Sequence, residues 1–561
     1  MAGGGSPELF DGLSARERYE FDTFGFVHLP SVLSAAELAA AQSAADRPPP
    51  ATAPLPELGE FSFAAEPELE LLATHPAVLP VLLELCRGHP HLVSSSATPE
   101  GGQQLHSQRE ADPGSHASYT FEVPAGRCRC DSLVVIVYLE TVDPGDDSLL
   151  VFPASHKSYF RRPPALFDLH EDGGEASAAV PDGLISLRPR AGDFIVMSEA
   201  TCHATRGQNP RRVMMMRYKT GVSYRAHEKA PQSPDALRQL LSAPTLAAIH
   251  GDFDALQALC EKRIDPELPE PRRCWSYSRN ARVVVDSHDR SDAEIMTPEQ
   301  RYLFDCFGFV HLAGVLSAAE LAAARAAFER TRLRDAPSRG IQADSNVDGE
   351  PLREPALELV ATHKHLVPIL LEVCEGAPHL TGMSLIYNAP RTGPPRMTCP
   401  YGELHCHGEL PDKGDNVSFH STSGRVVTDD LVVFAYLEDV QPGDGGLGVV
   451  PGSMKANCIR PPTAAWPYSS GPDGTAFGME TANGRWRAPA GGDVLPEMGP
   501  QSLLSESRGG SSALGVPDGM LQLTPAAGDF IIISEKVSHC TINCNKNNAQ
   551  NVLNFLLKLH R

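Results

Sequence analysis

The sequence predicts an α+β protein that contains two copies of one domain, each with helices first and a barrel or sandwich of short strands after them. Three observations predict this class. The chain has 561 residues, too many for a single hydrophobic core. Four long segments occur twice, in the same order. Each copy passes from helical patterns to short apolar runs separated by turn residues.

The repeat sets the domain boundaries. Residues 19–41 match 302–324, 67–92 match 355–380, 131–157 match 429–455, and 181–203 match 517–539. The period is far too long for a solenoid unit, so the copies are whole domains. We expect a first domain at 1–221, a partly helical connector at 222–295 with one helix over 233–249, and a second domain at 296–561. A Gly/Pro/Ser-rich insertion after Pro462 is loop-like by composition.

The helical part of each copy begins with a recognisable start signal. Ser34 with Glu37, and Ser317 with Glu320, have the spacing of a capping box, which satisfies the unpaired amides at a helix start. An Ala/Leu-rich helix follows each of them. His28, His311, His75 and His363 recur in these helical opening motifs, and packing or capping explains them.

The strand part follows from apolar runs and turn residues. Nearly continuous apolar runs at 133–139 and 431–437 are typical of strands buried on both faces. Pro144-Gly145 and Pro442-Gly443 fit the centre of a type II turn. Further strands are expected at 194–197 and 530–533, each directly after a Gly-Asp pair.

Composition and charge exclude several classes of function. With 42% apolar and 21% charged residues, the chain resembles a soluble globular protein, and it has no apolar run long enough to cross a bilayer. A net charge of -22 argues against nucleic acid as a partner, because a binder needs clustered Lys and Arg. Thirteen scattered cysteines and an N-terminus without a secretory pattern indicate reduced thiols and, by default, the cytoplasm.

The motifs of each copy resemble those of the phytanoyl-CoA dioxygenase family. The resemblance lies in the FDTFGFVHLPSVLS opening, the YLE-x-V-x-P-G-D turn, the P-A/G-S-H/M-K segment, and an A-G-D-F strand that leads to a His. It spans nearly all of each copy. It implies a double-stranded β-helix (a jelly-roll, cupin-like fold) with N-terminal helices packed on it, which holds Fe(II) and 2-oxoglutarate.

The resemblance also implies a ligand set. A His-x-Asp pair and a distal His bind the iron, and an Arg after the distal His binds the 2-oxoglutarate carboxylate. Two imidazoles and one carboxylate leave positions open for cosubstrate and oxygen, and a guanidinium fork fits a carboxylate. The matching histidines are His106 and His203 in the first copy, and His405 and His539 in the second. The matching Arg is Arg211, with Arg212 as the alternative.

Both copies depart from this pattern. The first has Gln108 at the carboxylate position, where it either coordinates through its carbonyl or leaves room for water or an anion, as in related halogenases. The second has His407 there, and Gln550-Asn551 in place of the Arg pair. Since residues i and i+2 share a face of a strand, His405, His407 and His539 could hold a metal without a carboxylate; the alternative is a drifted, inactive site. Glu110 and Glu409 are further candidate ligands, although exposed loop glutamates explain them more simply.

These features lead to two hypotheses. The first is a non-haem Fe(II), 2-oxoglutarate-dependent dioxygenase of the hydroxylase type that acts on a small molecule. The second is a degenerate binding or scaffolding protein that kept the fold and lost the chemistry. Metal content distinguishes them. The sequence names neither the substrate nor the oligomeric state.

Overall fold

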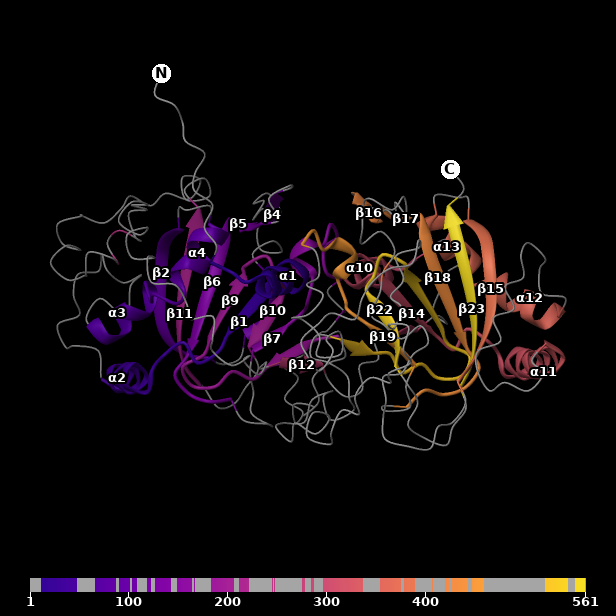
Figure 1. The fold of residues 1–561 in the computed structure, drawn as a ribbon, viewed down its shortest axis with the longest axis horizontal. Coiled ribbons are helices and arrows are strands. Elements are labelled where there is room, and N and C mark those ends of the chain that lie inside the picture. The colour runs from indigo at the N-terminus through magenta and orange to yellow at the C-terminus, as the bar shows by residue number, and fades with distance from the viewer. Residues whose placement is uncertain are drawn as a thin grey trace, which may run out of the picture.

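The computed structural model places a helix-and-sheet unit in each half of the chain, side by side (Figure 1). It describes residues 12–47, 66–86, 90–100, 103–107, 119–122, 127–142, 149–163, 166, 183–205, 211–220, 245, 247, 275–277, 284–286, 296–335, 354–374, 378–388, 406, 419–422, 425–441, 446–458, 520–542 and 550–559. The expected helix at 233–249 and both Pro-Gly turns lie outside these residues, the helix except for 245 and 247.

The described residues of the first half form four helices and two five-stranded sheets. The helices are α1 (Ala15–Phe24), α2 (Ala35–Ala45), α3 (Pro67–Ala73) and α4 (Leu79–Leu85). One sheet has the order β1-β9-β6-β11-β2, from Phe26–Leu29, Phe194–Ser198, Ser132–Tyr138, Arg211–Thr220 and Pro90–Glu100. The other has the order β12-β8-β7-β10-β3, from Trp275–Tyr277, Ile185–Leu187, Leu149–Val151, His203–Thr205 and Gln103–His106. All neighbouring strands in both sheets are antiparallel.

The second half has a corresponding arrangement. Its helices are α10 (Pro298–Phe307), α11 (Ala318–Asp335), α12 (Pro355–Ala361) and α13 (Val367–Val373). One sheet has the order β13-β14-β21-β18-β23-β15, from Val284–Asp286, Phe309–Ala313, Phe530–Ser534, Asp430–Tyr436, Gln550–Leu559 and Pro378–Asn388. A second has the order β20-β19-β22, from Leu521–Gln522, Gly446–Val449 and His539–Ile542. Apart from the parallel β13–β14 pair, the strands are again antiparallel, which agrees with the predicted α+β class.

Two short hairpins complete the described elements. The first is β4 (Tyr119–Glu122) with β5 (Arg127–Cys130), and the second is β16 (Phe419–Thr422) with β17 (Arg425–Thr428). Short 3₁₀ turns also follow β7 and β19, at Ser155–Lys157 and Ser453–Lys455. Among the described residues, no helix is long and apolar enough to cross a membrane.

Strand β6 shows why an apolar run without alternation forms a strand here. All seven of its residues are buried. Val134 and Ile136 pack in one apolar cluster with residues of the second sheet, such as Leu150. Val135 belongs to a different cluster, which includes helix residues such as Leu82. Both faces of β6 are therefore covered, one by the second sheet and one by helices, as the sequence predicts.

The predicted capping boxes are present. The Ser34 side chain accepts a hydrogen bond from the Glu37 amide, and the Glu37 carboxylate accepts one from the Ser34 amide. Ser317 and Glu320 repeat these contacts. Each exchange satisfies amides that the first helical turn leaves without partners, and so fixes where the helix begins.

His28 and His311, in the opening motifs of the two halves, each form a buried hydrogen bond with an aspartate. His28 Nε2 lies 2.9 Å from Asp193 Oδ2, and His311 Nε2 lies 2.8 Å from Asp529 Oδ2. Burial raises the pKa of Asp193, but hydrogen bonds from His28 and from backbone amides outweigh it, so the pKa stays below its ordinary value. The Gly-Asp motif thus joins β1 to the turn before β9, and β14 to the turn before β21, which gives these histidines a structural role.

The two halves meet through aromatic side chains and a tight backbone contact. Phe152 lies 4.9 Å from Phe307 and 5.5 Å from Tyr302 between ring centroids, and it is fully buried. Ala154 and Gly452, at the same place in the two halves, both have positive φ, 64° and 81°. A Cβ atom on Gly452 would collide with the Ala154 Cβ and would lie 3.0 Å from the Thr23 carbonyl oxygen. The two turns therefore approach each other too closely for a side chain at position 452.

Candidate functional site

The two histidines predicted in the first half lie on adjacent strands. His106 ends β3 and His203 begins β10, and the two residues are direct partners in the antiparallel register. Their ring centroids are 4.4 Å apart, with the planes tilted by 51°. His106 is exposed, and His203 is only partly accessible. The sheet therefore brings together two imidazoles that are far apart in the sequence, at a position open to solvent.

A backbone contact fixes the His203 ring. Its Nδ1 lies 2.8 Å from the Thr201 carbonyl oxygen. Because a carbonyl can only accept, Nδ1 carries the hydrogen and donates it, which leaves the lone pair on Nε2. Metal-binding histidines use the same arrangement to set their orientation and tautomer.

The electrostatics of His203 favour the neutral ring. Burial, followed by the positive charges of His106 and Arg217, lowers the pKa of His203 to about 4. A neutral imidazole is the form that binds metal, so this side chain is ready to act as a ligand at neutral pH.

His539 has the same contact in the second half. Its Nδ1 lies 2.7 Å from the Val537 carbonyl oxygen, and the side chain is buried. Its predicted partners, His405 and His407, lie outside the described residues, whereas Cys406 between them is partly exposed. Burial lowers the pKa of nearby Lys536. The charge of Cys406 raises the same pKa, but by less.

Gln108 and Glu110, the candidates for a third ligand beside His106 and His203, lie outside the described residues. Within the part of the chain that the structure describes, no group of three His, Cys, Asp or Glu side chains could hold a metal. Two imidazoles are a donor set that suits Fe(II), provided that oxygen ligands complete it.

Arg212 lies among carboxylates. Its Nε is 2.8 Å from Glu140 Oε1, and its Nη1 contacts Asp46, the residue that ends α2. Hydrogen bonds to Asp46 and then to Glu140 raise its pKa. Because these partners already occupy the guanidinium, Arg212 is less suited than Arg211 to a cosubstrate carboxylate. Arg211 begins β11, and its side chain lies outside the described part of the structure.

The strand register supports the match between Arg211-Arg212 and Gln550-Asn551. Val213 in β11 pairs with Tyr138, and Val552 in β23 pairs with Tyr436, at the same point of the corresponding strand. Counting back from these pairs, Gln550 occupies the position of Arg211. The second half therefore has an amide where the first has a guanidinium.

Two further arginines lie near the histidine pair and were not predicted from the sequence. Arg162 Nη2 donates to the Leu105 carbonyl oxygen, one residue before His106, at 3.2 Å. Arg217 pairs with Glu199 at 2.9 Å, and its charge contributes to the lowered pKa of His203. The sequence does contain a signal for Arg217, because this charged residue directly follows the apolar run Met214–Met216.

Comparisons with known proteins give likenesses in structure alone. No protein-family model and no curated protein matches the chain. One similar solved structure is HygX from Streptomyces hygroscopicus with nickel, 2-oxoglutarate and hygromycin B bound, at 21% identity and a TM-score of 0.29; the match covers 37% of this chain and 87% of HygX.

Two others come from nogalamycin biosynthesis and are described as non-haem α-ketoglutarate-dependent enzymes. The epimerase SnoN, solved with Fe3+, α-ketoglutarate and nogalamycin RO, is 16% identical, with a TM-score of 0.28 and coverage of 46% of this chain and 80% of SnoN. The carbocyclase SnoK is 15% identical, with a TM-score of 0.28 and coverage of 48% and 85%.

Proposed function

We propose that the first half of the chain binds Fe(II) and 2-oxoglutarate and hydroxylates a small molecule. The same proposal describes the chain as a tandem duplication of a double-stranded β-helix domain similar to phytanoyl-CoA dioxygenase, divided at 1–221, 222–295 and 296–561. The paired strand orders of the two halves support the duplication. The observation that carries the function is the His106–His203 pair, with the His203 Nδ1 hydrogen bonded to the backbone.

Each residue has a definite role in this proposal. His106 and His203 would hold the metal through neutral imidazoles. Gln108 would either coordinate through its amide oxygen or leave a position for water. Arg211 would bind the 2-oxoglutarate carboxylate, because Glu140 and Asp46 already occupy the guanidinium of the alternative, Arg212. When bound, Fe(II) with 2-oxoglutarate would use dioxygen to hydroxylate a C–H bond: one oxygen atom would enter the product and the other succinate, with release of carbon dioxide.

The second half has a different role in the proposal. Gln550 and Asn551 offer no guanidinium for a carboxylate, so this half would not bind 2-oxoglutarate. Any metal there would rest on His405, His407 and His539, for structure or for chemistry that does not use this cosubstrate.

One observation favours the alternative, a binding or scaffolding protein without catalysis. Gln108 replaces the carboxylate that would neutralise part of the charge of Fe(II). Under this alternative the purified chain would not retain iron, and the histidine pair would serve packing alone.

Metal and cosubstrate binding by the full chain test the proposal. We expect His203→Ala to remove Fe(II) and 2-oxoglutarate binding from the first half, while the matched change His539→Ala leaves 2-oxoglutarate binding intact. Arg211→Ala should weaken 2-oxoglutarate binding by about 2–5 kcal/mol, the cost of losing one partner of a buried charge pair, as measured by calorimetry. Arg212→Ala should not weaken it, since Arg212 is paired with Glu140 and Asp46.

Three results would contradict the proposal. The first is a wild-type chain that binds no Fe(II) under reducing, oxygen-free conditions. The second is loss of 2-oxoglutarate binding in His539→Ala but not in His203→Ala. The third is a larger effect from Arg212→Ala than from Arg211→Ala.

A further inference from the structure

Two buried carboxylates connect the halves in a crossed arrangement. Asp22 on α1 pairs with Lys157 of its own half, and it accepts hydrogen bonds from the amides of Asn457 and Cys458 at 2.6 and 2.9 Å. The 455–458 segment of the second half is therefore fixed against α1 of the first.

Asp305 repeats the arrangement from the other side. It pairs with Lys455 at 2.5 Å and accepts from Ser158 Oγ and the Tyr159 amide at 2.9 and 2.8 Å. Each lysine also donates to the backbone of the other: Lys157 Nζ lies 2.7 Å from the Lys455 carbonyl oxygen, and Lys455 Nζ lies 3.1 Å from that of Lys157. The two sets of contacts are related by an approximate twofold axis between the halves.

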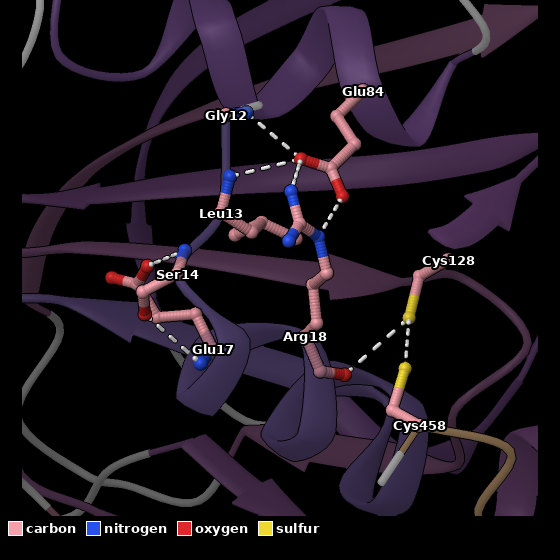
Figure 2. Close-up of polar contacts among 8 residues, drawn as sticks. All are labelled: Gly12, Leu13, Ser14, Glu17, Arg18, Glu84, Cys128 and Cys458. Atoms are coloured by element: carbon pink, nitrogen blue, oxygen red, sulfur yellow. Dashed lines mark hydrogen bonds and ion pairs between the residues drawn. The ribbon is translucent and has the colours of Figure 1, made fainter. Parts of the chain in front are cut away.

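These contacts place Cys458 inside the first half. Its side chain belongs to the apolar cluster that contains Tyr19 on α1 and Cys128 on β5. The Sγ atoms of Cys128 and Cys458 are 3.7 Å apart, and both side chains are buried (Figure 2). The thiols thus approach each other across the interface between the halves.

The surroundings of Cys128 are fixed as well. Its thiol donates to the Arg18 carbonyl oxygen, with 3.4 Å between the atoms. The Arg18 side chain makes two contacts with Glu84, at 2.5 and 3.0 Å, as Figure 2 shows. Glu84 also accepts from the amides of Gly12 and Leu13. Both cysteines therefore lie on backbone that several polar contacts hold in place.

The approximate symmetry provides an internal comparison. In the other half, Val426 occupies the position of Cys128, and Phe160 that of Cys458. Val426 is buried in the apolar cluster that also contains Val134 and Ile136 of β6, and Phe160 packs against the same cluster. Apolar side chains fill the corresponding place there, so packing alone does not require thiols at 128 and 458.

We propose that Cys128 and Cys458 form a reversible disulfide that links the two halves covalently. A disulfide needs its sulfur atoms at about 2.05 Å, so they must approach by less than about 2 Å. The oxidant is a low-molecular-weight disulfide such as oxidised glutathione. One cysteine thiolate attacks it and releases one glutathione thiolate, and the second cysteine thiolate displaces the other. Two protein thiols lose two protons and two electrons, and one oxidised glutathione becomes two reduced molecules.

The environment sets the rate of this reaction. The contact with Cys128, followed by burial, raises the pKa of the Cys458 thiol. Because the thiolate is the reacting form, exchange is slow at neutral pH and faster in alkaline solution. Burial also shields the product from reductants, so reduction is slow in the folded protein.

Thiol counting and peptide mapping on the full chain test the proposal. The native protein is incubated with oxidised glutathione at mildly alkaline pH, freed of the oxidant, unfolded in denaturant that contains the alkylating reagent, and then digested. The number of thiols should fall by two from thirteen, with a peptide that joins Cys128 to Cys458 within one molecule. Oxidation should raise the thermal midpoint, because it closes a long loop in the unfolded chain.

Variants make the result specific. Cys458→Ser, or Cys128→Val with the residue found at position 426, should abolish the linked peptide and the rise in thermal midpoint. Cys130→Ser is the matched control, since it removes another buried thiol from β5. It should leave the linked peptide and the rise in thermal midpoint unchanged. The proposal is overturned if the native protein keeps both thiols after prolonged oxidation. It is also overturned if the linked peptide persists in Cys458→Ser, or if the mapped disulfide joins two molecules.

Discussion

Replacement of Gly452 by Ala should destabilise the contact between the halves, and the structure gives the size of the effect. Gly452 has φ of 81°, in the left-handed region, where a Cβ costs about 1–2 kcal/mol. The reduced freedom of the unfolded chain returns about 0.4–1 kcal/mol. The added methyl also collides with Ala154, and overpacking of this kind costs about 1–3 kcal/mol. The total loss in the free energy of unfolding is about 1–5 kcal/mol.

Three further variants separate strain from collision. Gly192 has a similar φ of 90°, but a Cβ there would meet nothing closer than 3.5 Å, so Gly192→Ala measures backbone strain alone. Ala154→Gly removes the methyl that the new side chain at 452 strikes. The double variant Ala154→Gly, Gly452→Ala should therefore recover about 1–3 kcal/mol relative to the sum of the single changes.

Urea denaturation of the full chain, followed by near-UV circular dichroism, measures all four variants. The reasoning is refuted if Gly452→Ala costs no more than Gly192→Ala. It is equally refuted if the effects at 154 and 452 add to within about 0.5 kcal/mol, because residues in collision cannot act independently.

Three other predictions follow. Asp305→Asn should lower the free energy of unfolding by about 3–5 kcal/mol in urea titrations, since it leaves the Lys455 ammonium buried without its carboxylate; a loss below 1 kcal/mol would contradict this. Asp193→Asn should destabilise the protein near neutral pH, but progressively less as the pH falls below about 4, because the lowered pKa of Asp193 stabilises the fold only while the carboxylate is ionised. Parallel stability curves for variant and wild type across this pH range would exclude that hydrogen bond as the cause. In a chain that lacks both histidines of the first site, His407→Ala should remove any remaining bound metal; metal retained in that variant makes His407 a bystander.

Local spacing predicted the elements whose start or burial depends on neighbouring residues. Ser34 with Glu37 forms the capping box that its spacing indicates, and the apolar run at 133–139 becomes a strand covered on both faces. The capping box depends on contacts within one helical turn, and the strand depends on the pattern of apolar residues along one segment. Both can be read directly from the sequence.

Long-range polar pairs were beyond that reasoning. Asp22 contacts Cys458 across 436 positions of sequence, and nothing near either residue specifies the other. The sequence contained one signal for these pairs, a carboxylate at the same position among apolar residues in both copies. Asp22 follows Phe21, and Asp305 follows Phe304. A carboxylate at such a place implies a buried partner, but pattern alone does not name it.

The candidate site also has one part that the sequence could predict and one part that it could not. Motif positions brought His106 and His203 together, because strand pairing turns two distant matches into neighbours. Arg211 and Arg212 could not be separated by motif, since they are consecutive. Only the carboxylates around Arg212, contributed by Glu140 and Asp46, distinguish them.

The crossed contacts between the halves also have a consequence during protein synthesis. Lys157 reaches the backbone of Lys455, 298 residues later in the chain. At about 5–20 residues per second, roughly 15–60 s separate the appearance of these two residues on the ribosome. Throughout that interval Asp22 lacks the amides of Asn457 and Cys458 that it will bind, and for roughly the first half of it Phe152 also lacks Tyr302 and Phe307. Neighbouring ribosomes on one message therefore carry first halves with the same incomplete interface, which a chaperone would keep apart.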